Sequence, residues 1–172
     1  METAKYSAVE QTRDGRKIEI RALKPEDRTD LLDAVGRTSS QSLYRRFFGA
    51  KRHFSEKEVA FFLNVDFKSH VALVATAEEG GQVVIAAGGR YVVQSPGTAE
   101  VAFVVTDNYQ GQGLGRALLR HLAILGRDAG LTEFTAEVLP ENLPMLKVFE
   151  KSGLKSSTKR KPGVVHVTLQ LC

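Results

Sequence analysis

The junction between a strand-like segment and a glycine-rich helix start, at residues 104–116, constrains this chain more than any other feature. Its sequence, VVTDNYQGQGLGR, passes from apolar residues through a short loop into a helix with Leu114, Leu118, Leu122 and Leu125 on one face. The first amides of a helix have no partner inside the helix, and glycines let an anion approach the backbone without meeting a Cβ atom. The junction therefore predicts an anion-binding site, with phosphate as the default ligand.

Spacing separates this loop from two common phosphate-binding loops. A Walker loop would continue with Gly-Lys-Ser or Gly-Lys-Thr, which the sequence lacks. A dinucleotide-binding loop would carry Gly or Ala in place of Arg116 and would normally follow the first strand of a parallel sheet. The remaining pattern is Gln or Arg, two residues, Gly, one residue, then Gly or Ala. Gln110, Gly113 and Gly115 match it without a gap.

The hydrophobic pattern places this loop in the middle of an α+β domain. Before the loop it predicts helices at 25–35, at 39–48 and from 55 onward, and strands at 17–23, 71–77, 83–93 and 98–105. After the loop it predicts a helix at 113–128, a strand at 132–139, a helix from 142 to 152 and strands at 154–158 and 164–171. Asn142 is expected to cap its helix.

Composition narrows the class of protein further. The chain has 172 residues and a net charge of +4, a size at which a core forms without disulfides. The lone Cys172 cannot pair within the chain, no His, Asp and Glu spacing resembles a metal site, and no run approaches the roughly 18 apolar residues of a membrane span. We therefore expect a cytoplasmic protein without a metal or a membrane partner.

Two basic clusters, at residues 45–52 and 151–161, raise the question of nucleic acid. A net charge of +4 is too small for a typical nucleic-acid footprint, and charge clusters usually only solvate a surface. We expect no nucleic-acid partner, although binding through these clusters remains an alternative.

The glycine loop resembles the pyrophosphate loop of the GNAT superfamily of N-acetyltransferases, which bind acetyl-coenzyme A. Asn142 stands where these proteins carry the asparagine of a later motif, and FEKSGL at 149–154 resembles the close of that motif. Four further segments are similar to the acetyltransferase domain of bacterial protein-lysine acetyltransferases that act on AMP-forming acyl-CoA synthetases. They are SLYRRFF at 42–48, VD at 65–66, HVALVA at 70–75 and AEVAF at 99–103.

This resemblance implies the fold, the cosubstrate and its binding residues. The fold would be a GNAT-type mixed, mostly antiparallel sheet flanked by helices, in one domain over residues 1–172 with a core of about 16–171. The cosubstrate would be acetyl-CoA, with no metal. The cofactor-binding residues implied are Val104, Val105, Gln110, Gly111, Gln112, Gly113, Gly115, Arg116, Asn142 and Phe149.

Acetyl transfer to an amine calls for a base, because a lysine side chain with a pKa of about 10.4 is protonated at neutral pH. Alternation along residues 98–105 places Glu100 on the same face as Ala102 and Val104. Glu100 also stands at the position of the catalytic glutamate in the resembled family. Phe149 stands where many GNAT enzymes carry a tyrosine that protonates the leaving thiolate. Either solvent supplies that proton or catalytic activity is lost, and the sequence leaves both open.

The expected function is transfer of an acetyl group from acetyl-CoA to an amine, above all a lysine side chain of a protein such as an AMP-forming acyl-CoA synthetase. A small amine as acceptor and a non-catalytic acyl-CoA sensor remain alternatives, and a homodimer is left open. His70 and His121 lie in apolar segments and are interpreted as buried, partnered side chains rather than catalytic groups.

Overall fold

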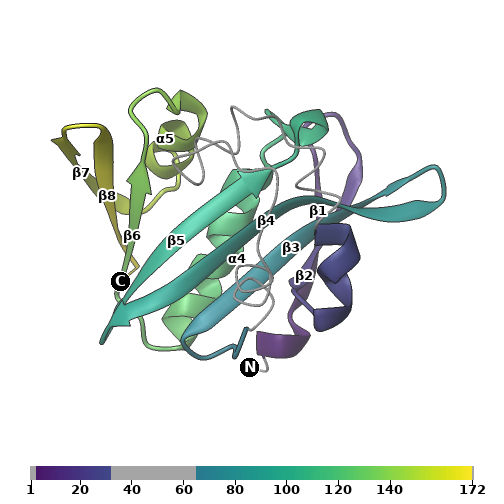
Figure 1. Ribbon diagram of the computed structural model, residues 1–172, viewed down its shortest axis with the longest axis horizontal. Coiled ribbons are helices and arrows are strands. Elements are labelled where there is room, and N and C mark those ends of the chain that lie inside the picture. The colour runs from purple at the N-terminus through teal and green to yellow at the C-terminus, as the bar shows by residue number, and fades with distance from the viewer. Residues whose placement is uncertain (1–2, 32–64, 172) are drawn as a thin grey trace.

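An eight-stranded mixed sheet organises the residues that the computed structural model describes, 3–31 and 65–171. Its strands lie in the order β1-β2-β3-β4-β5-β6-β8-β7 (Figure 1). Every neighbouring pair is antiparallel except β5 and β6, which are parallel. The expected α+β fold with a mixed, mostly antiparallel sheet is confirmed.

The predicted elements after residue 70 are all present, with small shifts at their ends. The strands are β1 (Ser7–Gln11), β2 (Lys17–Ala22), β3 (His70–Glu79), β4 (Gln82–Ser95), β5 (Thr98–Val105), β6 (Glu133–Val138), β7 (Lys155–Lys161) and β8 (Val164–Gln170). The helices described over their whole length are α4 (Leu114–Asp128) and α5 (Leu143–Glu150), with 3-10 turns at Thr3–Lys5, Pro25–Asp27 and Asp107–Tyr109. Residues 28–31, after the second of these turns, are also helical. The helices predicted at 39–48 and from 55 onward, and the end of the one at 25–35, lie outside the described residues.

The start of the chain contains a strand that its sequence pattern does not predict. β1 pairs antiparallel with β2 and lies at one edge of the sheet. Its residues alternate only between exposed and half-buried, so no regular apolar alternation marks the segment. β1 also precedes residue 16, where the predicted core begins.

The main core lies between the sheet and α4, which covers the rear face of the sheet in Figure 1. The four leucines that form the predicted apolar stripe of α4 are all buried. They pack in one cluster with the fully buried Ile18, Ile20 and Phe134 from the strands. This packing holds the start of α4, and the glycine loop before it, against the end of β5.

Gly89 on β4 shows how closely this core is packed. A Cβ atom at Gly89 would stand 2.7 Å and 2.9 Å from two ring carbons of Phe103 and 3.3 Å from a methyl carbon of Leu122. At the neighbouring Gly88, the only contact within 4 Å among the described residues would be the carbonyl oxygen of Leu73, at 3.7 Å. Two adjacent glycines on one strand therefore differ sharply in the space beside them.

We predict that Gly89→Ala lowers the free energy of unfolding by about 1–3 kcal/mol, because the added methyl group overpacks the core. Gly88→Ala is the matched control and should leave stability unchanged or raise it by up to about 1 kcal/mol, since alanine restricts the unfolded chain. Urea unfolding followed by circular dichroism measures both. Equal stability of the two variants would contradict the packing described.

Candidate active site

β5 and β6 run side by side for only three residue pairs and then separate. The last of these pairs joins Glu100 to Thr135, whereas β5 continues to Val105 and β6 to Val138. The two strands diverge toward the end of the sheet where α5 lies (Figure 1). Between them opens a cleft of about 560 Å³, lined by β5, the glycine loop, the start of α4, the end of β6 and α5.

The cleft brings together nearly all of the residues that the sequence singles out. Its walls include Glu100, Val104, Val105, Gln110, Gly111, Gly113, Gly115, Arg116, Asn142 and Phe149. Gln112 is the exception. Its backbone carbonyl accepts from the amide of Arg13 at 3.3 Å, and its side-chain oxygen accepts from the amide of Asp14 at 3.2 Å.

The glycine loop has the geometry of an anion site. Gly111 and Gly113 have φ angles of 76° and 86°, in a region that residues with side chains rarely adopt. Within the part of the chain that the structure describes, a Cβ at Gly111 would meet nothing within 4 Å, and one at Gly113 would meet only Arg13, at 4.0 Å. These residues therefore leave the backbone of the loop accessible. The first turn of α4 contains no acidic residue, which leaves the positive end of the helix dipole uncompensated there.

Arg13 is a cleft residue that the sequence does not single out. It lies in the turn between β1 and β2, and its Nη1 donates to the carbonyl oxygen of Gly111 at 3.3 Å. The same turn is held by Arg16, whose guanidinium lies 4.3 Å from the ring centre of Tyr109. Arg13 and Gly111 are 98 residues apart in the chain, and the strand that leads to Arg13 was not predicted, so no local signal marks this contact.

The opposite wall of the cleft is formed by α5. Asn142 caps this helix as the sequence predicts, because its side-chain oxygen accepts from the amide of Met145 at 3.3 Å. Phe149 is buried, and its ring centre lies 6.1 Å from that of Phe103 on β5. An aromatic contact without a hydroxyl group therefore occupies the position at which the resembled family carries a proton-donating tyrosine.

Glu100 lies where β5 and β6 part, on the face of the sheet opposite α4. Its side chain is exposed, and within residues 3–31 and 65–171 its carboxylate has no hydrogen bond or ion pair. The register places Glu100 opposite Val92 and Val92 opposite His70, so all three share one face across three strands. An exposed, unpaired carboxylate at the mouth of a cleft can accept a proton from an incoming amine.

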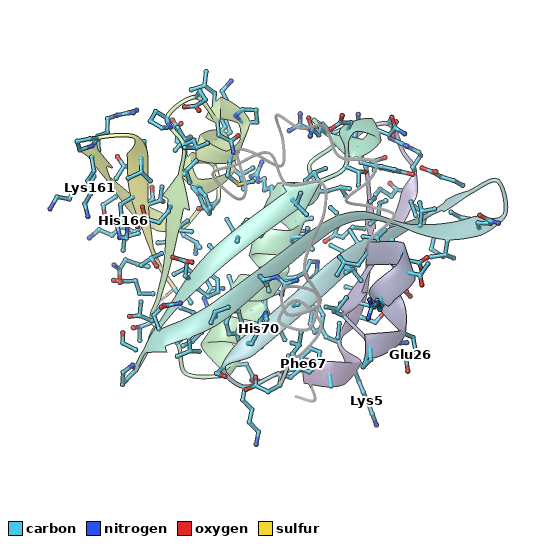
Figure 2. The ribbon with its side chains drawn as sticks, in the orientation of Figure 1. Lys5, Glu26, Phe67, His70, Lys161 and His166 are labelled. Carbon is cyan, nitrogen blue, oxygen red and sulfur yellow. The ribbon has the colours of Figure 1, made fainter. Side chains whose placement is uncertain are left out.

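The histidine interpretation is confirmed, since both residues are buried and partnered. Nε2 of His70 accepts from Nη1 of Arg90 at 2.8 Å, and His70 lies near Phe67 in Figure 2. Burial, followed by the neighbouring Arg90 guanidinium, lowers the pKa of His70 to about 4. His121 contacts Tyr6 through one ring nitrogen and Glu10 through the other, at 2.8 Å.

Comparison with known proteins now identifies the class. The family model described as acetyltransferase (GNAT) family matches residues 37–154. The crystal structure of the GNAT domain of S. lividans PAT is similar over 95% of this chain and 96% of that one, with 35% identity and a TM-score of 0.85. The chain belongs to the GNAT family of acetyltransferases.

Two curated relatives place it within that family. Acetyltransferase Pat of Mycolicibacterium smegmatis is 32% identical over 145 residues, which cover 83% of this chain and 43% of that protein. Acetyltransferase PA5475 of Pseudomonas aeruginosa is 32% identical over 126 residues, 73% of this chain and 68% of that protein. The chain thus spans less than half the length of the Pat relative. The resemblance drawn from the sequence motifs is confirmed.

Two features of the described residues bear on membranes and metals. Within the described parts of the chain, no helix has the length and apolar character needed to cross a membrane. Among the same residues, no three His, Cys, Asp or Glu side chains come together as a metal ion would require.

We predict that His70 makes stability pH-dependent. The folded protein resists protonation of His70 until about pH 4, whereas an unfolded histidine takes up a proton near pH 6.5. Acidification between these values therefore favours the unfolded chain, and His70 should steepen the loss of unfolding free energy by up to about 1.4 kcal/mol per pH unit. Urea titrations from pH 7.5 to 4.5 test this. His70→Gln should flatten the profile, and parallel profiles for the two proteins would refute the prediction.

Proposed function

We propose that this chain transfers an acetyl group from acetyl-CoA to a lysine side chain of a protein. One observation carries the proposal: β5 and β6 diverge immediately after Glu100, so the carboxylate and the glycine loop lie at opposite ends of one cleft. The anion site would hold the cosubstrate, and the carboxylate would meet the acceptor amine.

Acetyl-CoA fits the cleft in charge and in hydrogen-bonding capacity. The amides at the start of α4, with Arg13 and Arg116 at the cleft wall, suit a pyrophosphate. Lys147 and Lys151 on the α5 side add two further cations. Beyond Glu100, β5 has no partner among the described strands on its β6 side, and this free edge can hydrogen-bond the amides of a pantetheine arm as an added strand would.

Groups in the cleft serve each step of the transfer except the last. Bound acetyl-CoA supplies the activated acetyl thioester. Deprotonating a lysine ammonium at pH 7 costs about 4 to 5 kcal/mol, and Glu100 accepts that proton at the cleft mouth. The backbone amide near Val104 polarises the carbonyl oxygen of the thioester. Phe149 cannot donate a proton, so solvent protonates the departing thiolate, whose pKa of about 8.5 makes it a fair leaving group.

Similarity to the Pat acetyltransferase supports a protein acceptor, and an AMP-forming acyl-CoA synthetase is the acceptor that the sequence motifs favour. A small amine would use the same carboxylate. A non-catalytic acyl-CoA sensor would bind acetyl-CoA but would transfer the acetyl group to no acceptor.

Acetyl-CoA should raise the melting temperature of the parent, because a ligand at 100 times its dissociation constant stabilises the folded state by about 2.7 kcal/mol. Gly113→Val should abolish this shift, because a side chain would stand where the loop backbone meets phosphate. Gly163→Val is the matched control: Gly163 also has a positive φ, of 77°, but lies in the β7–β8 turn, where an added Cβ would meet no described residue within 4 Å. Both variants should lose about 1–2 kcal/mol to backbone strain.

Thermal unfolding with and without acetyl-CoA distinguishes the two effects. Only Gly113→Val should lose the ligand-induced shift, whereas Gly163→Val should keep it. A shift retained in Gly113→Val would show that the glycine loop does not bind the cosubstrate. Absence of any shift in the parent at millimolar acetyl-CoA would count against acetyl-CoA itself.

Glu100→Gln should lower turnover about 10²- to 10⁴-fold at pH 7, since glutamine cannot accept the ammonium proton. Acetyl-CoA affinity should be nearly unchanged, and the defect should shrink toward the pKa of the amine, where the acceptor arrives already deprotonated. Glu150→Gln, on the exposed side of α5, is the control and should behave as the parent. Thiol release with a protein acceptor is the assay. Retention of more than about a third of parental turnover, with chemistry rate-limiting, would reject Glu100 as the base.

A further inference from the structure

Glu100 begins a row of side chains that crosses the outer part of the sheet to its edge. The register places Glu100 opposite Thr135 on β6, Thr135 opposite Thr168 on β8, and Thr168 opposite Ser157 on β7. Residues directly opposite one another project from the same face. Because neighbouring strands lie about 4.8 Å apart, the row is about 14 Å long. The face that β6, β8 and β7 present on this side is called the outer face below.

The charge of the outer face changes sign along this row. On β6, next to Glu100, the positions two residues before and after Thr135 are Glu133 and Glu137. On β7, at the far end, the positions two residues before and after Ser157 are Lys155 and Lys159. The acidic strip therefore lies beside the proposed base, and the basic strip lies at the sheet edge.

Polar side chains on β8 connect the two strips. Nδ1 of His166 lies 2.7 Å from a carboxylate oxygen of Glu137, and Nε2 of Gln170 donates to Glu133 at 3.3 Å. The register sets His166 opposite Lys159 and Gln170 opposite Lys155. The outer face is thus polar from β6 to β7.

The cations of β7 are available to a partner. All seven residues of this edge strand are exposed, and Figure 2 shows Lys161 projecting away from the β7–β8 hairpin. Within the described residues, no side chain of Lys155, Lys159, Arg160 or Lys161 has a hydrogen bond or ion pair. Lysines on an unpaired edge strand also discourage aggregation. That role alone would not explain why carboxylates on β6 stand at the other end of the row.

We propose that the outer face docks the protein substrate and selects an acidic group about 14 Å from the acceptor lysine. The lysine ammonium is attracted by Glu100, Glu133 and Glu137, and the acidic group of the substrate pairs with Lys155 and Lys159. A substrate lysine at the basic strip, or a substrate carboxylate at the acidic strip, would meet like charges. At about 3.4 Å per residue, 14 Å corresponds to about four residues of extended chain. This inference rests on the proposed acetyl transfer at Glu100.

The test compares two peptides that share a central lysine. One carries Glu four residues to each side of the lysine, and the other carries Arg at those positions. With the parent at low salt, kcat/KM should favour the Glu peptide about three- to tenfold, as expected for two exposed ion pairs.

The double variant Lys155→Glu/Lys159→Glu should reverse the preference. The control Lys5→Glu/Lys17→Glu makes the same charge change near β1 and β2 and should keep it. At 1 M NaCl the preference should fall toward one.

The outcomes separate this inference from the proposed function. If the parent acetylates neither peptide nor any protein acceptor, the proposed function fails and the docking surface with it. If the parent acetylates both peptides and the double variant leaves their ratio unchanged, the docking inference alone is wrong. Tight oligonucleotide binding that the double variant abolishes, with the peptide ratio unchanged, would also overturn the inference and would assign the β7 cations to nucleic acid.

Discussion

The parting of β5 and β6 is the constraint on which the rest of the site depends. β6 pairs with β8 over six residue pairs but with β5 over only three, so its direction follows the β8–β7 hairpin rather than β5. The contact of Phe149 with Phe103 holds α5 beside the diverging end of β5. The same divergence frees one edge of β5, opens the cleft and leaves Glu100 at the point where the two strands part. A fully paired sheet would have none of these features.

The glycine-loop end of the cleft depends on contacts between segments that lie far apart in the chain. The buried leucine stripe of α4 sets the helix against the sheet, so the loop before it must turn sharply, and Gly111 and Gly113 supply the positive φ angles for that turn. The β1–β2 turn then braces the loop through Arg13 and through Arg16 on Tyr109. Basic and amide groups gather at this end, whereas carboxylates gather near Glu100. The charge along the cleft therefore changes from positive at the glycine loop to negative at Glu100.

The sheet is divided at the same point into two parts with different surroundings. The β1 to β5 part carries the α4 core and, on its other face, the buried pair of His70 and Arg90. The β6, β8 and β7 part ends in a strand whose seven residues are all exposed. On the face of the sheet opposite α4, polar residues continue from one part to the other through the pair of Glu100 and Thr135. A substrate bound at Glu100 would therefore lie across the boundary between a packed half and a solvated half.

The sequence by itself determined the features that depend on neighbours along the chain. Period-two alternation indicates β5, the leucine spacing indicates α4, and Asn142 indicates the start of α5. Each of these signals comes from residues within one helix or one strand, so it can be read from neighbouring positions in the sequence. Tertiary structure alone decided the rest: the place of Arg13 on the glycine loop, the existence of β1 as an edge strand, and the row from Glu100 to Ser157. These depend on pairings between segments far apart in the chain, and their register is set by packing across the whole sheet rather than by any local pattern.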